Sequence, residues 1–302
     1  MLQNDPRSLD ALCGKAKAAE RQKKYQIALD TLNEIVVEHP KFQPAIVEKA
    51  RLLLTIYDWE QSFEMTQQAL SMDKHNIKAL MIHIFHLLAR EGKIEESLEK
   101  LKSLNYAIEK TEPKNADILF ECARLFSRIS GRHPDVLLIT FNFCERARKL
   151  KPLDADLAVE LAEENLMINN VKEAYSLFQE AVSLDETKIE ALTGMIQCRI
   201  RQGMIDDAEQ QLEFVNEIQV SVGRTPEMAY LEAMLCSRKP HTSMEAKIAE
   251  TCKFVDEALK LHISATKSLV PDLGFYVKLN PDFLMNLTKG KLLLHENHLY
   301  CV

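Results

Sequence analysis

The chain has 302 residues, a net charge of −7 and a sequence pI of about 5.8. This acidic balance argues against a protein that binds nucleic acid, because binding to the phosphate backbone needs a basic face. No apolar run approaches the roughly 18 residues that a membrane-spanning helix requires, and the start MLQNDPRSLD lacks the pattern of a signal peptide. We therefore expect a cytoplasmic protein with no nucleic-acid partner and no direct membrane insertion.

The composition favours helices throughout. Glycine is scarce, with 8 residues in 302, and no proline lies between Pro44 and Pro113 or between Pro152 and Pro226. Strand signals such as alternating β-branched runs are close to absent. The seven cysteines form no C-x-x-C pair, which is typical of free thiols in a reducing compartment.

A repeated pattern predicts a series of helical hairpins. The second helix of each hairpin places an apolar or small residue at steps of three, four and three, which brings all four onto one helical face. The pattern begins at residues 25, 59, 94, 171 and 205, at intervals of 34, 35, 77 and 34. A further copy is expected inside the long interval, at 136–147, with Thr140, Cys144 and Ala147 at its later positions.

In chain order, the spacing predicts six hairpins. They pair residues 8–21 with 25–38, 43–56 with 59–72, 76–90 with 94–108, 115–130 with 134–150, 154–168 with 171–184, and 188–202 with 205–220. A stacked array of such units is an α-solenoid, which grows by adding repeats and needs no single closed core.

The predicted organisation has four parts. Residues 1–7 form an N-terminal tail, and residues 8–220 form six repeats. Residues 221–262 form a degenerate seventh repeat, with Thr225 as N-cap and Pro226 just inside the first helix. Residues 263–302 form an irregular or helical tail, interrupted by prolines and glycines.

The repeated positions are interpreted as packing positions. Trp59, the only tryptophan, falls at the same place as four other apolar residues, so a structural role is favoured over a functional one. Small residues on the same face let a neighbouring helix approach closely. The structural positions are Tyr25, Ala28, Leu32, Trp59, Ser62, Ala69, Ile94, Ser97, Val171, Ala174, Phe178, Ala181, Ile205 and Ala208.

Catalytic and metal-binding patterns are weak. The sequence has no glycine-rich phosphate loop and no nucleophile elbow. His83 and His86 lie three residues apart, as do His295 and His298, but neither pair has the further ligands of a typical metal site. We expect no catalysis, no metal, no cofactor and no small-molecule substrate.

A surface for protein partners is expected along the first helices, because successive first helices of a repeat array line one face. The candidate groove residues are Lys15, Arg51, His86, Arg124, Glu163 and Arg199. Their mixed charges give no simple preference for a partner. Cys13 and Lys17 stand where chaperone-binding repeats carry a particular Asn and Lys pattern, which argues against a carboxylate clamp.

The hairpins resemble tetratricopeptide repeats. The resemblance rests on Ala28, Leu32, Ile35 and Pro40 in the first hairpin, and on the run of Ala174, Phe178 and Ala181 in the fifth. It implies an all-α solenoid of stacked hairpins in a right-handed superhelix.

A closer resemblance is to the tetratricopeptide repeat protein 21 family. It rests on KPLDADLAVELAEENLMINNVKEAYSLFQEAVSLDETKIEALTGMIQCRIRQGMIDDAEQQLEFV at 151–215 and on KLNPDFLM at 278–285. The family supplies the long repeat subunit of intraflagellar transport complex A, and its chains are several times longer than this one. The resemblance implies a partial or alternatively ended chain that serves as a scaffold for other complex A subunits. It also implies a place in the cilium, in retrograde ciliary transport and in cilium assembly.

An alternative shares the fold and differs in its partner. The chain would then be a freestanding adaptor or co-chaperone that binds short peptide segments. An enzyme enclosed in a helical shell is a third hypothesis, and the missing ligand clusters weigh against it.

Overall fold

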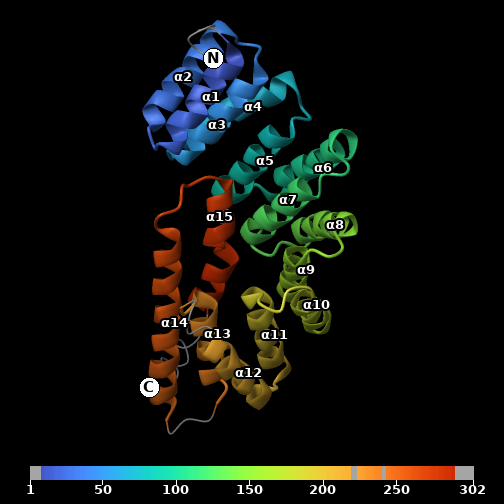
Figure 1. Ribbon diagram of the computed structural model, residues 1–302, viewed down its shortest axis with the longest axis vertical. Coiled ribbons are helices and arrows are strands. Elements are labelled where there is room, and N and C mark those ends of the chain that lie inside the picture. Colours follow the sequence, from blue (N-terminus) through green and yellow to red (C-terminus); the bar gives the residue numbers. More distant parts are fainter. Residues whose placement is uncertain (1–7, 219–222, 240–242, 290–302) are drawn as a thin grey trace. The chain divides into compact units, whose positions relative to one another are not determined.

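The computed structural model describes residues 8–218, 223–239 and 243–289. Within these ranges every regular element is helical, which confirms the predicted all-α fold of stacked hairpins (Figure 1). The expected N-terminal tail and the pair His295 and His298 lie outside the described residues. None of the described helices is both long enough and apolar enough to cross a bilayer.

The helices form two compact units. Among the described residues, the first comprises 8–114 and 270–276. Its helices are α1 (Leu9–Arg21), α2 (Tyr25–Glu38), α3 (Gln43–Thr55), α4 (Trp59–Met72), α5 (Ile77–His86), the π-helical turn η1 (Leu87–Glu91) and α6 (Ile94–Thr111), together with the first half of α15 (Leu273–Leu279). Each helix of α1 to α6 packs on the next one in sequence.

The second unit comprises the described residues of 115–269 together with 277–289. Its helices are α7 (Ala116–Ile129), α8 (Pro134–Leu150), α9 (Ala155–Met167), α10 (Val171–Leu184), α11 (Ile189–Gln202), α12 (Ile205–Ile218), α13 (Pro226–Cys236) and α14 (Met244–Thr266), followed by the end of α15 and a helical stretch at 281–289. The first helices contact one another in the order α7, α9, α11 and α13, so they form one continuous layer.

Side-chain caps fix where many of the helices begin. Asp58, Asn76, Asn115 and Asp154 each accept a hydrogen bond from a backbone N–H in the first turn of the helix that follows. Such caps satisfy donors that the helix itself leaves unpaired. Thr225 caps α13 in the same way, with Pro226 at the first helical position, as predicted.

In each of the first six hairpins, the turn between the two helices contains a residue with a left-handed backbone conformation. It stands two positions before the second helix, at Lys23, Tyr57, Gly92, Arg132, Asn169 and Gly203, with φ between 59° and 83°. The 77-residue interval between positions 94 and 171 therefore spans two repeat lengths, and Arg132 lies in the turn of the hairpin formed by α7 and α8. The extra length lies in the second helices, because α6 has 18 residues and α8 has 17, whereas α2, α4, α10 and α12 each have 14.

The repeated positions differ in burial along each second helix. In each of the helices α2, α4, α6, α10 and α12, the first of the four repeated positions is half-buried, as at Trp59 and Val171. The later positions are buried: Ala28, Leu32, Ser62, Ala69, Ser97, Ala174, Phe178, Ala181 and Ala208. Thr140, Cys144 and Ala147 of α8 are also buried.

An aromatic cluster fills the interior of the first unit near α4 and α5. The Trp59 ring stacks on Phe85 with centroids 5.6 Å apart, and it meets the edge of His86 at 5.3 Å. His86 is 1% exposed, and its Nε2 lies 3.0 Å from the hydroxyl of Ser62. Tyr276 completes the cluster, with its centroid 4.6 Å from that of Phe85.

This cluster predicts a pH-dependent stability. Burial, together with the nearby His83 and Arg90, lowers the pKa of His86 to about 4, while Glu91 opposes them. The unfolded chain therefore binds a proton below pH 6.5 that the folded chain excludes, so stability falls as the pH drops from about 6.5 to about 4. Between pH 7 and pH 5 we expect a loss of about 2 kcal/mol from this group.

Urea unfolding followed through the fluorescence of Trp59 measures this effect. The variant His86→Gln is the control, because its side chain does not titrate in this range. A pH dependence as steep in the variant as in the native chain would contradict the assignment to His86.

Candidate functional site: a polar cavity in the second unit

Arginines link neighbouring first helices. In the first unit, Arg51 of α3 donates two hydrogen bonds to the carboxylate of Glu20 on α1, at 2.7 and 2.5 Å. In the second unit, Arg128 of α7 pairs with Glu160 of α9 through two bonds of 2.8 Å. These bidentate pairs hold successive repeats in register.

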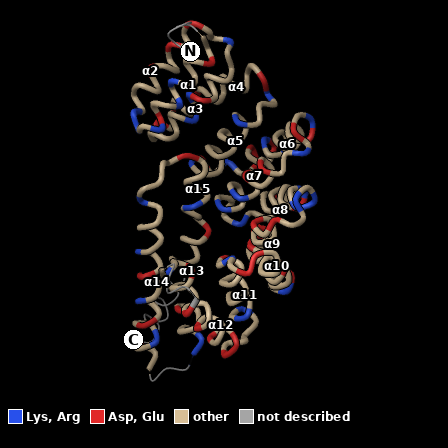
Figure 2. Tube along the Cα trace, viewed as in Figure 1, with Lys and Arg blue, Asp and Glu red and all other residues tan. Residues whose placement is uncertain are grey.

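The pair in the second unit belongs to a larger charge cluster. Arg128 also binds Glu163, while Glu164 accepts a hydrogen bond from Thr140 at 3.3 Å. Acidic residues gather on α9 accordingly (Figure 2). Burial raises the pKa of Glu164 well above its usual value, and the nearby carboxylate of Glu160 raises it further. The buried guanidinium thus faces three carboxyl groups, of which those of Glu160 and Glu164 are also buried.

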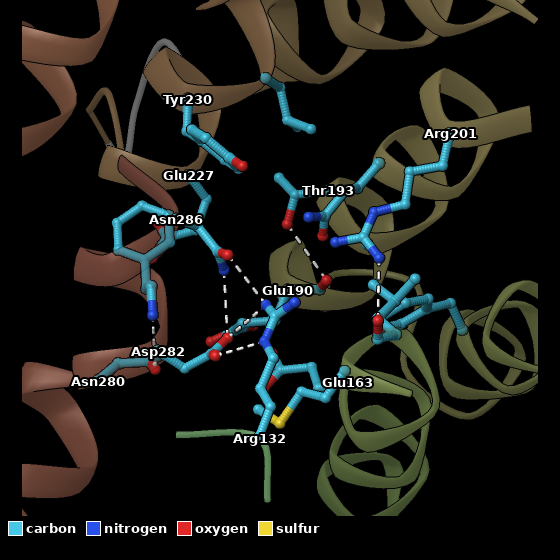
Figure 3. Close-up of a pocket in the computed structure, with 17 residues that line it drawn as sticks. Arg132, Glu163, Glu190, Thr193, Arg201, Glu227, Tyr230, Asn280, Asp282 and Asn286 are labelled. Carbon is cyan, nitrogen blue, oxygen red and sulfur yellow. Dashed lines mark hydrogen bonds and ion pairs between the residues drawn. The ribbon is translucent and has the colours of Figure 1, made fainter. Parts of the chain in front are cut away.

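A polar cavity of about 140 Å³ opens beside this cluster (Figure 3). Its walls come from the α7–α8 turn, α9, α10, α11, α13 and residues 280–286, all within the second unit. Its polar lining includes Arg132, Glu163, Glu190, Thr193, Gln197, Arg201, Glu227, Tyr230, Asn280, Asp282 and Asn286. The cavity therefore lies where the layer of first helices meets the end of the described chain.

One wall is a clamp around Arg132. Its Nε and Nη2 donate to the carboxylate of Asp282 at 2.6 and 2.8 Å, and Nη2 also donates to Asn286 at 3.0 Å. Asn286 in turn donates to Asp282 at 3.2 Å, so the three side chains form a closed set (Figure 3). The hydrogen bond to Asp282 raises the pKa of Arg132, and Asp282 is 8% exposed.

Another wall carries the guanidinium of Arg201, which donates to the backbone carbonyl of Leu166 at 2.9 Å (Figure 3). Among the described residues, Arg201 forms no ion pair with an acid. Burial lowers the pKa of Arg201 and raises that of Tyr230, which lines the same cavity. Arg201 can therefore accept a further anionic partner.

Of the six residues predicted to line a partner groove, Glu163 lines this cavity. Lys15 is exposed on α1, Arg51 is held by Glu20 and Glu48, and Arg124 lies over the ring of Phe120 with 42% of its side chain exposed. The three basic residues thus stay candidates for a partner surface, at separate places along the chain.

The prediction was wrong for His86, whereas for Arg199 it stays a prediction. His86 is enclosed by the aromatic cluster and cannot contact a partner. Arg199 binds Tyr175 of α10 at 2.7 Å and Asp207 of α12 at 3.1 Å, so it faces the second helices. Residues two apart on a helix point about 200° apart, which places Arg201 on the cavity side and Arg199 on the other.

The face of α11 that lines the cavity was not predicted from the sequence. Thr193, Gln197 and Arg201 follow one another at intervals of four, the spacing of one helical face. This polar spacing was visible in the sequence. The sequence does not show that residues 280–286 contribute to the cavity wall, because they contact a turn about 150 residues earlier in the chain.

The two histidines of the first unit do not form a metal site. His83 is buried and stacks on Phe63 at 5.0 Å, and burial lowers its pKa. Among the residues that the structure describes, no group of three or more His, Cys, Asp or Glu side chains is arranged to hold a metal ion.

Comparisons with known proteins agree with the repeat architecture. Among solved structures, a tetratricopeptide repeat protein from Parabacteroides merdae matches with a TM-score of 0.64 over 94% of this chain and 98% of that one, at 13% identity. PilW, a type IV pilus biogenesis factor, matches with a TM-score of 0.57 over 72% of this chain and 96% of that one, at 16% identity. At these identities the matches concern the fold alone.

Two family models match the sequence. The model of the second ARM domain of tetratricopeptide repeat protein 21 covers residues 99–296, and that of its N-terminal ARM repeat covers residues 2–63. The chain is 38% identical over 277 residues to human tetratricopeptide repeat protein 21B, and 35% identical over 297 residues to human tetratricopeptide repeat protein 21A. These matches cover 92% and 96% of this chain but only 21% and 22% of the relatives, so the chain spans about a fifth of their length. The chain belongs to the tetratricopeptide repeat protein 21 family.

Proposed function

We propose that the chain is a non-catalytic scaffold that binds protein partners within intraflagellar transport complex A. Membership of the tetratricopeptide repeat protein 21 family is the observation that carries this proposal. The repeat fold supports it, because such arrays offer extended surfaces for protein segments. The chain would act in the cytoplasm and the cilium, in retrograde ciliary transport and cilium assembly.

The character of the polar cavity fits a protein partner. Charged groups of both signs line it, including Arg201 and Glu227, and the space of about 140 Å³ suits one or two side chains. Small-molecule pockets are larger, about 300–1,000 Å³, and mostly apolar.

The alternative is a freestanding adaptor that binds chaperone tails. Cys13 and Lys17 on α1 do not provide the Asn and Lys pattern expected of a carboxylate clamp. The net charge of −7 also disfavours acidic peptide tails as general partners.

Affinity capture of the tagged chain from ciliated cells, followed by mass spectrometry, tests the proposal. We expect the other complex A subunits among the recovered proteins, and an unrelated tetratricopeptide repeat protein of similar length serves as control. Recovery of chaperones without those subunits would contradict the proposal and favour the adaptor.

A further inference from the structure

Residues 280–289 form a short amphipathic helix on the second unit. Asn280 caps it by accepting a hydrogen bond from the N–H of Phe283 at 3.2 Å, and Pro281 occupies its first position. Phe283 and Leu287 pack against the cluster of α13 and α14, where Phe283 meets the edge of Tyr230 with centroids 5.5 Å apart. Asp282 and Asn286, one turn apart, face Arg132.

The contacts of this helix are those of a bound peptide. Apolar side chains on one face enter a hydrophobic surface, while an acid and an amide on the other face meet a fixed arginine. The backbone of Arg132 is positioned independently of the segment, because it stands at the left-handed position of the α7–α8 turn, whereas its guanidinium binds Asp282 and Asn286 of the segment. The receiving surface is thus built by the repeats themselves.

The segment is short and only partly buried. Nine helical residues are too few for a stable isolated helix. Within it, Asp282 and Leu287 are buried, whereas Phe283 and Leu284 are half-buried. A cavity of about 140 Å³ lies beside it, and Arg201 on the cavity wall donates to a backbone carbonyl. A short helix that fully buries a single apolar side chain, Leu287, opens more easily than the long helices on which it packs.

We propose that residues 280–289 are an internal occupant of a docking site for a partner helix. The partner would carry an acidic residue, an apolar residue directly after it and a carboxamide one turn later, matching Asp282, Phe283 and Asn286. It would bind Arg132 and the α13–α14 surface after displacing the chain's own segment. This inference rests on the proposed scaffold function and names the kind of partner segment that one surface accepts.

Peptide binding to the full 302-residue chain tests the proposal. The probe is a fluorescein-labelled peptide of residues 278–289. A variant chain with Asp282→Lys, in which the new lysine repels Arg132, is called the opened chain. We expect the peptide to bind the opened chain at least about tenfold more tightly than the native chain, whose site is filled. A peptide with Asp282→Asn should bind the opened chain about tenfold more weakly. A chain with Lys253→Ala, a change on α14 away from the clamp, should behave like the native one.

Equal affinities of the native and opened chains, or no binding to either, would overturn the proposal. A concentration-dependent dimer of the opened chain would also overturn it, because the occupant would then be a second copy. Hydrogen exchange of the native chain provides a check that needs no variant. Amides of 283–289 should exchange at least about tenfold faster than those of α13, and equal protection would contradict a displaceable segment.

The outcomes separate this inference from the proposed function. If complex A subunits are captured but the peptide does not bind, only the docking site fails. If the peptide binds but no complex A subunit is captured, the proposed function fails and the docking site stands.

Discussion

Replacing Arg128 with methionine is expected to lower the free energy of unfolding by about 3 to 5 kcal/mol. The substitution removes the buried cation that faces Glu160, Glu163 and Glu164. Methionine keeps much of the volume, so the loss would come from buried carboxyl groups that lose their buried cation, although Arg124 stays 3.7 Å from Glu160. Urea unfolding followed by circular dichroism, with hydrogen exchange at α7 and α9, measures it.

Two variants separate charge from packing. Lys151→Met removes an ion pair of the same unit, with Asp117, whose carboxylate is exposed, and should leave the unfolding midpoint unchanged. Adding Glu160→Leu to Arg128→Met should restore part of the lost stability, because it also removes a buried carboxylate. An Arg128→Met chain with the native midpoint would show that the cluster does not stabilise the second unit.

Replacing Gly194 with alanine is expected to destabilise the second unit by about 1 to 3 kcal/mol. A Cβ atom at this position would lie 2.3 Å from the ring of Phe178, which is 1% exposed and cannot move without disturbing α10. The glycine of one hairpin thus makes room for the aromatic ring of the hairpin before it. Urea unfolding gives the free-energy difference.

The chain offers a matched control for this substitution. Gly14 lies in α1, and a Cβ atom added there would meet nothing within 4 Å. Gly14→Ala should therefore stabilise by roughly 0.5 to 1 kcal/mol through helix propensity. In a double-mutant cycle, Phe178→Leu should relieve part of the cost of Gly194→Ala. Additive effects of the two changes would contradict a direct clash between Gly194 and Phe178.

The sequence predicts the hairpins well because local patterns determine them. Apolar spacing, caps such as Asp154 and the small residues at Ala174 and Ala181 all act within one repeat or between neighbours. The irregular interval was ambiguous for a physical reason. One additional helical turn in α6 and in α8 changes the period without interrupting either helix.

The candidate site was less predictable because it depends on contacts between distant segments. Nothing near Arg132 or Asp282 in the sequence indicates that they pair across 150 residues. The choice between Arg199 and Arg201 depends on which side of α11 meets the second helices, and both positions are polar. Glu163 was predicted, but its binding to Arg128 was not.

Binding of the purified chain to purified complex A subunits tests the scaffold account most directly. We expect the tagged chain to co-elute with at least one subunit as a stoichiometric complex in size-exclusion chromatography. Circular dichroism of the same sample confirms that the chain is helical. If the folded chain elutes alone when it is mixed with each subunit in turn and with all of them together, it is not a scaffold of this complex.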